Sequence, residues 1–139
     1  MKRCANALGR ALVVVVGMSV LCISIRAAED DAVKLRTKDA NAYYNRGNAK
    51  LNKGDLDGAI ADFNRAIELD PKYANAYNNW GNVLYDQNKY DEAVTKYQKA
   101  IELDPKYANA YNNWGNVLRD QKKYDEAEQK FAKARELSK

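Results

Sequence analysis

Apolar and aromatic side chains recur along the second half of the chain with the spacing of an α-helix. One face of a first helix follows the i, i+3, i+4, i+7 pattern. Its members are Tyr77, Trp80, Gly81 and Leu84. The polar segment 86–90 (DQNKY) interrupts the pattern as a turn, and a second face follows at the same spacing. Its members are Ala93, Tyr97, Ala100 and Ile101. The pattern therefore predicts two helices joined by a short turn.

This helix pair is repeated along the chain. The stretch AIELDPKYANAYNNWGNVL occupies residues 66–84 and recurs unchanged at residues 100–118. Alignment on the Gly-Asn pairs gives three units, at residues 40–73, 74–107 and 108–139, which form a domain over residues 40–139. One helix pair cannot bury its apolar face alone, so about three pairs must stack into a common core.

The shared positions of the units resemble those of the tetratricopeptide repeat (TPR) family. That motif has a large residue at position 4, a small residue at position 8, an aromatic at position 24 and alanine at positions 20 and 27. Here position 4 is Tyr43, Tyr77 and Tyr111, and position 8 is Gly47, Gly81 and Gly115. Position 24 is Phe63, Tyr97 and Phe131, and Pro71 and Pro105 close the first two units. The resemblance implies an all-α fold, a right-handed α-solenoid of three TPR helix-turn-helix repeats.

The first and last repeats depart from this pattern with charged residues. Arg46 and Lys50 stand where later repeats have Trp and Leu, and Glu128 and Arg135 replace apolar residues. End repeats of a solenoid need polar outer faces, so we expect an array of three. The alternative is that Glu128 and Arg135 form a docking end for another chain. The charged segment 29–39 is expected to lead into the first repeat, with a helix that covers it as one option.

The N-terminal segment 1–28 has the composition of a targeting sequence. It carries four basic residues and no acid, a 15-residue apolar run at residues 11–25, and small residues at Ala27 and Ala28. This order predicts a cleaved export signal, with an uncleaved membrane anchor as the alternative. We therefore expect an exported protein, periplasmic or secreted, that contacts the membrane only if the segment is retained.

Charge and missing residue types exclude several functions. The net charge of +4 comes from segment 1–28, because 19 basic and 19 acidic residues remain after it. A neutral domain without a basic stripe argues against nucleic-acid binding. The chain has no histidine, and its two cysteines lie in segment 1–28. The usual general base, thiol nucleophile and metal ligands are therefore missing, so we expect no enzyme, cofactor or metal site.

Asparagine dominates one stripe of each first helix, at positions 2, 5, 6 and 9, and fills eleven of its twelve places. We call these twelve residues the Asn stripe. They are Asn41, Tyr44, Asn45, Asn48, Asn75, Asn78, Asn79, Asn82, Asn109, Asn112, Asn113 and Asn116. Asn costs roughly half a kcal/mol per residue in a helix relative to Ala. In the TPR family the equivalent stripe lines a concave groove, so the resemblance implies recognition of a peptide there. The alternative is that neighbouring Asn side chains only bond one another.

The repeats also differ where selectivity would arise. Position 12 is Leu51, Tyr85 and Arg119, and with Tyr44 these residues are the candidates for partner selection. Drift between copies explains the differences equally well.

One known TPR activity is not expected. The family's clamp for the C-terminal carboxylate of cytosolic heat-shock chaperones resembles this stripe at Asn48 and Asn79. It also needs basic residues at the positions of Tyr44, Asn109 and Asn113, which are neutral here.

These observations predict a protein–protein interaction module or scaffold. It would bind an extended or helical segment of a partner in an Asn-lined concave groove, as a monomer or weak homo-oligomer. The alternative is a structural protein that assembles by stacking its end repeats.

Overall fold

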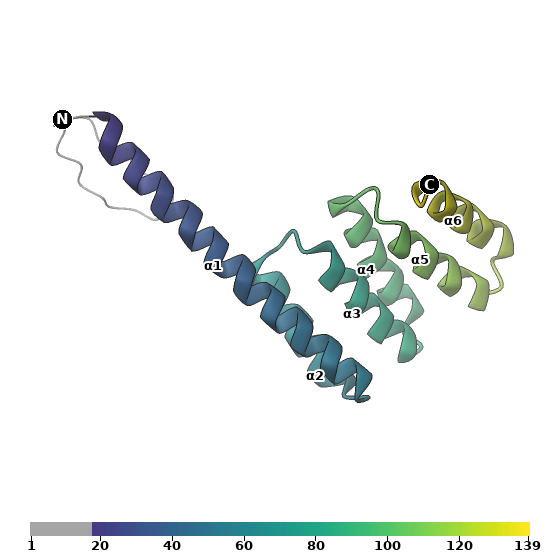
Figure 1. Ribbon diagram of the computed structural model, residues 1–139. Helices are drawn as coiled ribbons and strands as arrows, with labels where there is room; N and C mark the ends of the chain where they lie inside the picture. Colours follow the sequence, from purple (N-terminus) through teal and green to yellow (C-terminus); the bar gives the residue numbers. More distant parts are fainter. Residues whose placement is uncertain (1–17) are drawn as a thin grey trace. The chain divides into compact units, whose positions relative to one another are not determined.

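The computed structural model describes residues 18–139 and, within that range, the side chains of residues 29–32 and 34–139. Six α-helices follow one another without an intervening strand in this part of the chain (Figure 1). They are α1 (Met18–Asn52), α2 (Leu56–Leu69), α3 (Ala74–Asp86), α4 (Tyr90–Leu103), α5 (Ala108–Asp120) and α6 (Tyr124–Leu137). Most of the predicted export signal, residues 1–17, lies outside the described residues. No helix of the described part is long and apolar enough to span a membrane.

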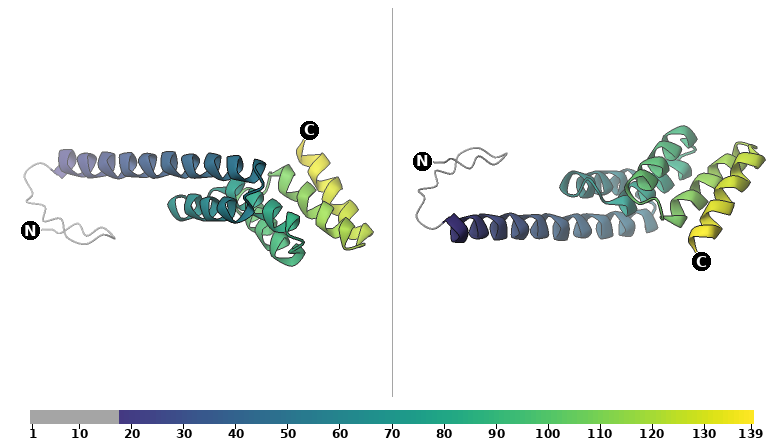
Figure 2. Two further views of the ribbon diagram at one scale, coloured as in Figure 1. Left: turned by 90° about the horizontal axis from the view of Figure 1, so that it is seen from below. Right: turned by 90° about the horizontal axis from the view of Figure 1, so that it is seen from above.

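The chain divides into two compact units between Leu35 and Arg36. The second unit, Arg36–Lys139, contains the three helix pairs. From α2 onward each helix packs against the next, and α3 also contacts α5, as the views in Figure 2 show for the C-terminal pairs. The prediction of an all-α solenoid of three TPR helix-turn-helix repeats is confirmed.

The turn inside each pair uses one left-handed residue. Gly54, Asn88 and Lys122 occupy the same repeat position, with φ values of +80°, 60° and 64°. After each of them, a backbone N–H returns to a carbonyl near the end of the preceding helix, as from Lys89 to Leu84 at 2.8 Å. Glycine adopts this conformation freely, whereas lysine has a steric cost there. The turn geometry is therefore shared although its residues differ.

Small residues allow the two helices of a pair to approach closely. A Cβ added to Gly81 would lie only 2.5 Å from the Tyr97 ring, and Gly47 and Gly115 face Phe63 and Phe131 in the same way. A glycine therefore faces the aromatic ring at position 24 in every repeat, a contact that the sequence pattern did not specify. This contact is why the first helix needs glycine there.

Successive repeats are joined by a valine that the helical pattern did not single out. Val83 of α3 is fully buried against Ala59 and Phe63 of α2. Val117 of α5 is fully buried against Ala93 and Tyr97 of α4. Each valine thus inserts into the core of the preceding repeat and fixes the stacking.

The charged residues of the first repeat surround a buried carboxylate. Asp62 is 3% exposed and accepts two hydrogen bonds from the Arg46 guanidinium, at 2.6 and 2.8 Å. Lys50 lies 3.0 Å from the same carboxylate. At the other end, Arg135 and Glu128 pair with each other at 2.6 Å, with both side chains about two-thirds exposed. The unusual charges of both end repeats thus have partners within the chain.

Candidate functional site

The Asn stripe comprises residues of very different exposure. Five of its asparagines are exposed: Asn41, Asn45, Asn75, Asn109 and Asn112. The others are partly buried, except Asn78, which is only 4% exposed. Of the selectivity candidates, Tyr44 and Tyr85 are partly buried and Arg119 is exposed. A single stripe in the sequence is therefore two sets of side chains in the structure.

The partly buried set forms hydrogen bonds between repeats. The amide nitrogen of Asn79 donates to Asn48 Oδ1 at 2.7 Å and to the Tyr44 hydroxyl at 3.0 Å. One repeat later, the amide nitrogen of Asn113 donates to Asn82 Oδ1 and to Asn78 Oδ1, both at 3.0 Å. In the second and third repeats, position 6 therefore donates to positions 5 and 9 of the repeat before it.

We call these bonded residues the Asn ladder. They are Tyr44, Asn48, Asn78, Asn79, Asn82 and Asn113. Asn78 also donates to Asn79 Oδ1 at 3.1 Å, which connects the two steps. A net hydrogen bond contributes about 1 kcal/mol, so these bonds offset part of the low helix propensity of Asn. For these six residues, the alternative interpretation, that neighbouring side chains bond one another, describes the structure.

A buried tyrosine fixes the orientation of one ladder residue. The Tyr97 hydroxyl donates to Asn82 Oδ1 at 2.9 Å. Burial raises the pKa of Tyr97, so the phenol stays protonated and remains a donor near neutral pH. With Asn113 donating to the same oxygen, the Asn82 side chain is held with its oxygen toward the protein.

The exposed set keeps most of its hydrogen-bonding capacity. Asn45, Asn75 and Asn112 make no side-chain hydrogen bond to other described residues. The other two are bonded: Asn41 accepts from the Tyr73 hydroxyl and donates to the Thr37 carbonyl, and the Asn109 side chain is hydrogen-bonded to Tyr107. An amide group offers two N–H donors and an acceptor. These side chains can therefore bond to the backbone of a ligand without breaking the ladder.

Two of the selectivity candidates converge on one carboxylate. The Tyr85 hydroxyl donates to Asp120, which raises the pKa of Tyr85. The Arg119 guanidinium lies 4.0 Å from the same side chain. Leu51 and Tyr85 also line an open pocket of about 330 Å³ with residues of α3, α4 and α5. Sequence reasoning missed Asp86 and Tyr97 as lining residues of this pocket; the recurrence of Asp86 as Asp120 one repeat later was the available signal.

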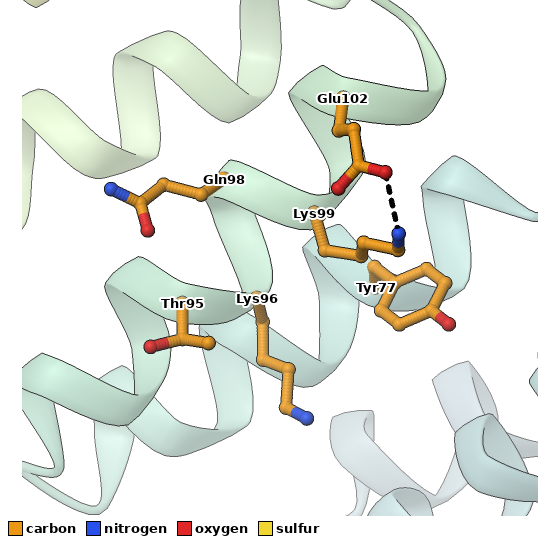
Figure 3. Close-up of a pocket in the computed structure, with 6 residues that line it drawn as sticks. All are labelled: Tyr77, Thr95, Lys96, Gln98, Lys99 and Glu102. Carbon is orange, nitrogen blue, oxygen red and sulfur yellow. Dashed lines mark hydrogen bonds and ion pairs between the residues drawn. The ribbon is translucent and has the colours of Figure 1, made fainter.

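A second hollow, of about 320 Å³, lies along α4 beside Tyr77 (Figure 3). Lys99 and Glu102 pair across it at 2.7 Å. The same i, i+3 pair recurs as Arg65–Glu68 and Lys133–Glu136 in the other repeats. The remaining cation of the lining, Lys96, lies over the Trp80 ring. Because these charges have partners and the ion pair is repeated, a structural role is favoured here.

Acidic side chains do not gather into a metal site in the described part of the chain. No group of three or more His, Cys, Asp or Glu side chains there has a geometry that could hold an ion. In the Asn ladder, the side-chain oxygens of Asn48, Asn78, Asn79 and Asn82 accept hydrogen bonds instead.

Comparison with known families identifies the repeats. The TPR repeat profile matches residues 47–87 and 81–118, and the tetratricopeptide repeat profile matches residues 108–139. The chain therefore belongs to the TPR family, whose members are in general non-catalytic protein-interaction modules. No curated protein gives a significant match.

Solved structures provide a second comparison. Two crystal structures of MamA are 34% and 35% identical to this chain, with TM-scores of 0.68 and 0.66. They cover 71% and 70% of this chain, which spans 58% and 54% of theirs. The match thus spans little more than half the length of the MamA chains.

A shorter relative shows a bound peptide. The second TPR of Spaghetti (RPAP3), bound to the HSP90 peptide SRMEEVD, is 28% identical with a TM-score of 0.71. The match covers 77% of this chain and 98% of that one. Family and neighbours together support a protein-interaction scaffold with protein or peptide partners.

Proposed function

We propose that this protein is an exported TPR scaffold that binds an extended or helical segment of a partner protein along the Asn stripe. The observation that carries the proposal is the division of the stripe. Asn45, Asn75 and Asn112 are exposed and keep their amide groups available, beside the six residues of the Asn ladder, which are bonded to one another. Amide groups suit the backbone of a peptide whatever its sequence.

The Asn ladder supports binding indirectly. Its bonds connect position 6 of one first helix to positions 5 and 9 of the helix before it. Side chains that are already ordered lose less conformational entropy when a ligand binds. The ladder would therefore hold the first helices, which carry the exposed asparagines, at a fixed spacing.

The peptide is not expected to resemble the acidic one bound to RPAP3. Tyr44, Asn109 and Asn113 are neutral at the positions where the carboxylate clamp needs cations. Tyr44 and Asn113 are also occupied by hydrogen bonds within the ladder. An anionic tail would find no charge-assisted partner at these positions.

Capture of partners from the native cell envelope tests the proposal. The variant Asn75→Ala/Asn112→Ala should lose the partners that the unchanged protein captures by crosslinking. Its unfolding temperature should not fall, because neither side chain is bonded and alanine favours the helix. The matched control is Asn64→Ala, an exposed asparagine of α2 outside the stripe, which should keep every partner. Retention of every partner by the double variant would show that the stripe is not the binding surface.

Export is the second part of the proposal and has its own measurement. It is supported by the basic and apolar composition of segment 1–28. Mass spectrometry of the mature N-terminus should find a chain that begins near Ala28 or Glu29. A chain that retains the apolar run would instead indicate a membrane anchor.

Self-assembly through the end repeats is the less favoured alternative. Glu128 and Arg135 already form an exposed ion pair, and stacking a second copy on them would remove both from water. Light scattering over a concentration series should therefore give a monomer or a weak oligomer. Growth of the particle mass with concentration, without a limit, would favour the structural alternative.

A further inference from the structure

The open pocket of about 330 Å³ lies where the first helices of all three repeats contribute side chains. It is lined by Leu51 from α1, by Asn82, Tyr85 and Asp86 from α3, by Tyr97 from α4, and by Asn113 and Asn116 from α5. All of them belong to the unit Arg36–Lys139. Three of the seven are members of the Asn stripe, so a ligand on the stripe would reach this pocket.

The ladder decides which atoms the pocket presents. Asn113 uses its amide nitrogen to donate to Asn78 and Asn82, and its Oδ1 accepts no hydrogen bond from the described residues. Asn82 Oδ1 accepts from both Asn113 and Tyr97. The amide nitrogens of Asn82 and Asn116 remain as donors. Asn113 thus faces its surroundings as an acceptor, which a freely rotating amide would not do.

The pocket also has one formal charge, and it is negative. Asp86 is exposed and forms no ion pair with a described residue. The nearest basic side chain on α5, Arg119, pairs with Asp120 at 4.0 Å and lies over the Phe131 ring, outside the lining. The Tyr85 hydroxyl donates to Asp120, so its proton is not available to neutralise Asp86. The carboxylate of Asp86 also contributes to the raised pKa of Tyr97.

We propose that this pocket receives a lysine or arginine side chain of the bound segment; this inference rests on the proposed function. The cation would lie between Asp86 and Asn113 Oδ1, with its methylene groups against Leu51 and Tyr85. Tyr97 closes the floor, since it is only 1% exposed. The specificity is then opposite in sign to that expected for the acidic peptide seen with RPAP3.

Four pentapeptides with blocked ends test the charge preference. Their sequences are alanine except at the centre, which is lysine, arginine, glutamate or norleucine. Titrated into isotope-labelled protein and followed by NMR, the lysine and arginine peptides should shift the side-chain amide signals of Asn82, Asn113 and Asn116. Their affinity should exceed that of the norleucine peptide by about fivefold, the size expected for an exposed charge pair.

Two variants assign the effect to the carboxylate. Asp86→Asn should remove the fivefold preference, whereas Asp125→Asn, an exposed carboxylate at the start of α6, should keep it. Circular dichroism would verify that both variants are folded. Equal binding of the norleucine and lysine peptides, an unchanged preference in Asp86→Asn, or no pocket shift with any peptide would each overturn the proposal.

The NMR titration distinguishes failure of the cation-pocket proposal from failure of the proposed function. Shifts confined to the signals of Asn75 and Asn112, with the pocket signals unmoved, would reject the cation pocket and leave peptide binding on the stripe intact. Loss of partner capture in the Asn75→Ala/Asn112→Ala variant is a separate readout, which does not depend on the charge of the peptide.

Discussion

The first and second repeats use the same two positions in opposite ways. In the second repeat, position 7 is Trp80, and the ammonium of Lys96 at position 23 lies 3.6 Å from its ring centroid. The third repeat has the same arrangement, with Lys130 at 3.7 Å from Trp114. In the first repeat the two positions hold Arg46 and Asp62, joined by two hydrogen bonds.

The comparison shows that each repeat needs two side chains at positions 7 and 23 that interact with each other. Neither position needs one particular residue. A cation over an indole ring and a guanidinium on a buried carboxylate both fill the space between the first and second helices. They differ in their neighbours. Trp80 packs against the core clusters on both of its sides, whereas Arg46 is 58% exposed. The aromatic version therefore stabilises the stack between repeats, and the ionic version stabilises its end.

The largest effect is expected when arginine, the residue at position 7 of the first repeat, replaces tryptophan at the same position of the second repeat. Trp80→Arg removes an aromatic that contacts two clusters and places a cation beside Lys96, so we expect a loss of about 3 kcal/mol in unfolding free energy. Trp114→Arg in the last repeat should cost about 2 kcal/mol, because Trp114 packs against one of the two clusters. Chemical denaturation followed by far-UV circular dichroism measures both, and equal losses would contradict the central role of Trp80.

A double-mutant cycle in the first repeat tests whether Arg46 and Asp62 stabilise the fold as an interacting pair. Arg46→Trp leaves the buried Asp62 with Lys50 alone, and Asp62→Lys brings three cations together, so each should cost about 2 kcal/mol. Together they recreate the aromatic–cation pair of the later repeats and should recover about 2 kcal/mol of the sum. Additive losses in the same denaturation experiment would mean that the two positions are independent.

Acid should weaken the ionic pair of the first repeat. The hydrogen bonds from Arg46 lower the pKa of Asp62 to about 2 from an ordinary value of 3.8. A carboxylate with a lowered pKa in the folded state stabilises it above the unfolded pKa, and this contribution disappears as the pH falls from about 4 to about 2. We expect a loss of up to about 2 kcal/mol in that window. Asp62→Asn should be less stable at neutral pH, and its difference from the unchanged protein should shrink at pH 2.

The smallest effect concerns the turns within the pairs. Lys122→Gly relieves a lysine at φ 64° and should stabilise the protein by about 1 kcal/mol. Gly54→Lys in the first repeat should destabilise it by a similar amount, since no atom lies within 4 Å of an added Cβ and only the φ of +80° opposes it. Asn88→Gly should lie near zero, because asparagine tolerates this conformation. A rise in unfolding temperature for Gly54→Lys would contradict the assignment.

The local part of the fold followed from the sequence. The repeat pattern placed a glycine at position 8 and an aromatic at position 24, and the structure brings Gly81 against the Tyr97 ring. Spacing could not find Val83, because its partners, Ala59 and Phe63, belong to the preceding repeat. The pairing of Asp62 with Arg46 also escaped, although comparison of the repeats position by position shows both residues changing together.

In the candidate site too, the sequence predicted what lies within one helix and missed the contacts between repeats. The period assigned twelve residues to one stripe, because neighbours three and four positions apart share a helical face. The helical period could not distinguish Asn79 from Asn75. The amide nitrogen of Asn79 donates to side chains of the preceding repeat, whereas Asn75 remains exposed and unbonded. That difference depends on the distance between successive first helices.

The sequence by itself determined the three helix pairs, their turns, the glycine and aromatic positions of each repeat and the membership of the stripe. All of these depend on residues close in the chain, or on a repeat period that can be counted. Only the tertiary structure decided which asparagines are bonded, that Asp62 is buried between two cations, and that Asp86 and Tyr97 share a pocket with the stripe. The bonded asparagines and the shared pocket require a specific distance between stacked repeats, which Val83 and Val117 set by packing into the neighbouring core. The burial of Asp62 depends on the packing of α1 against α2.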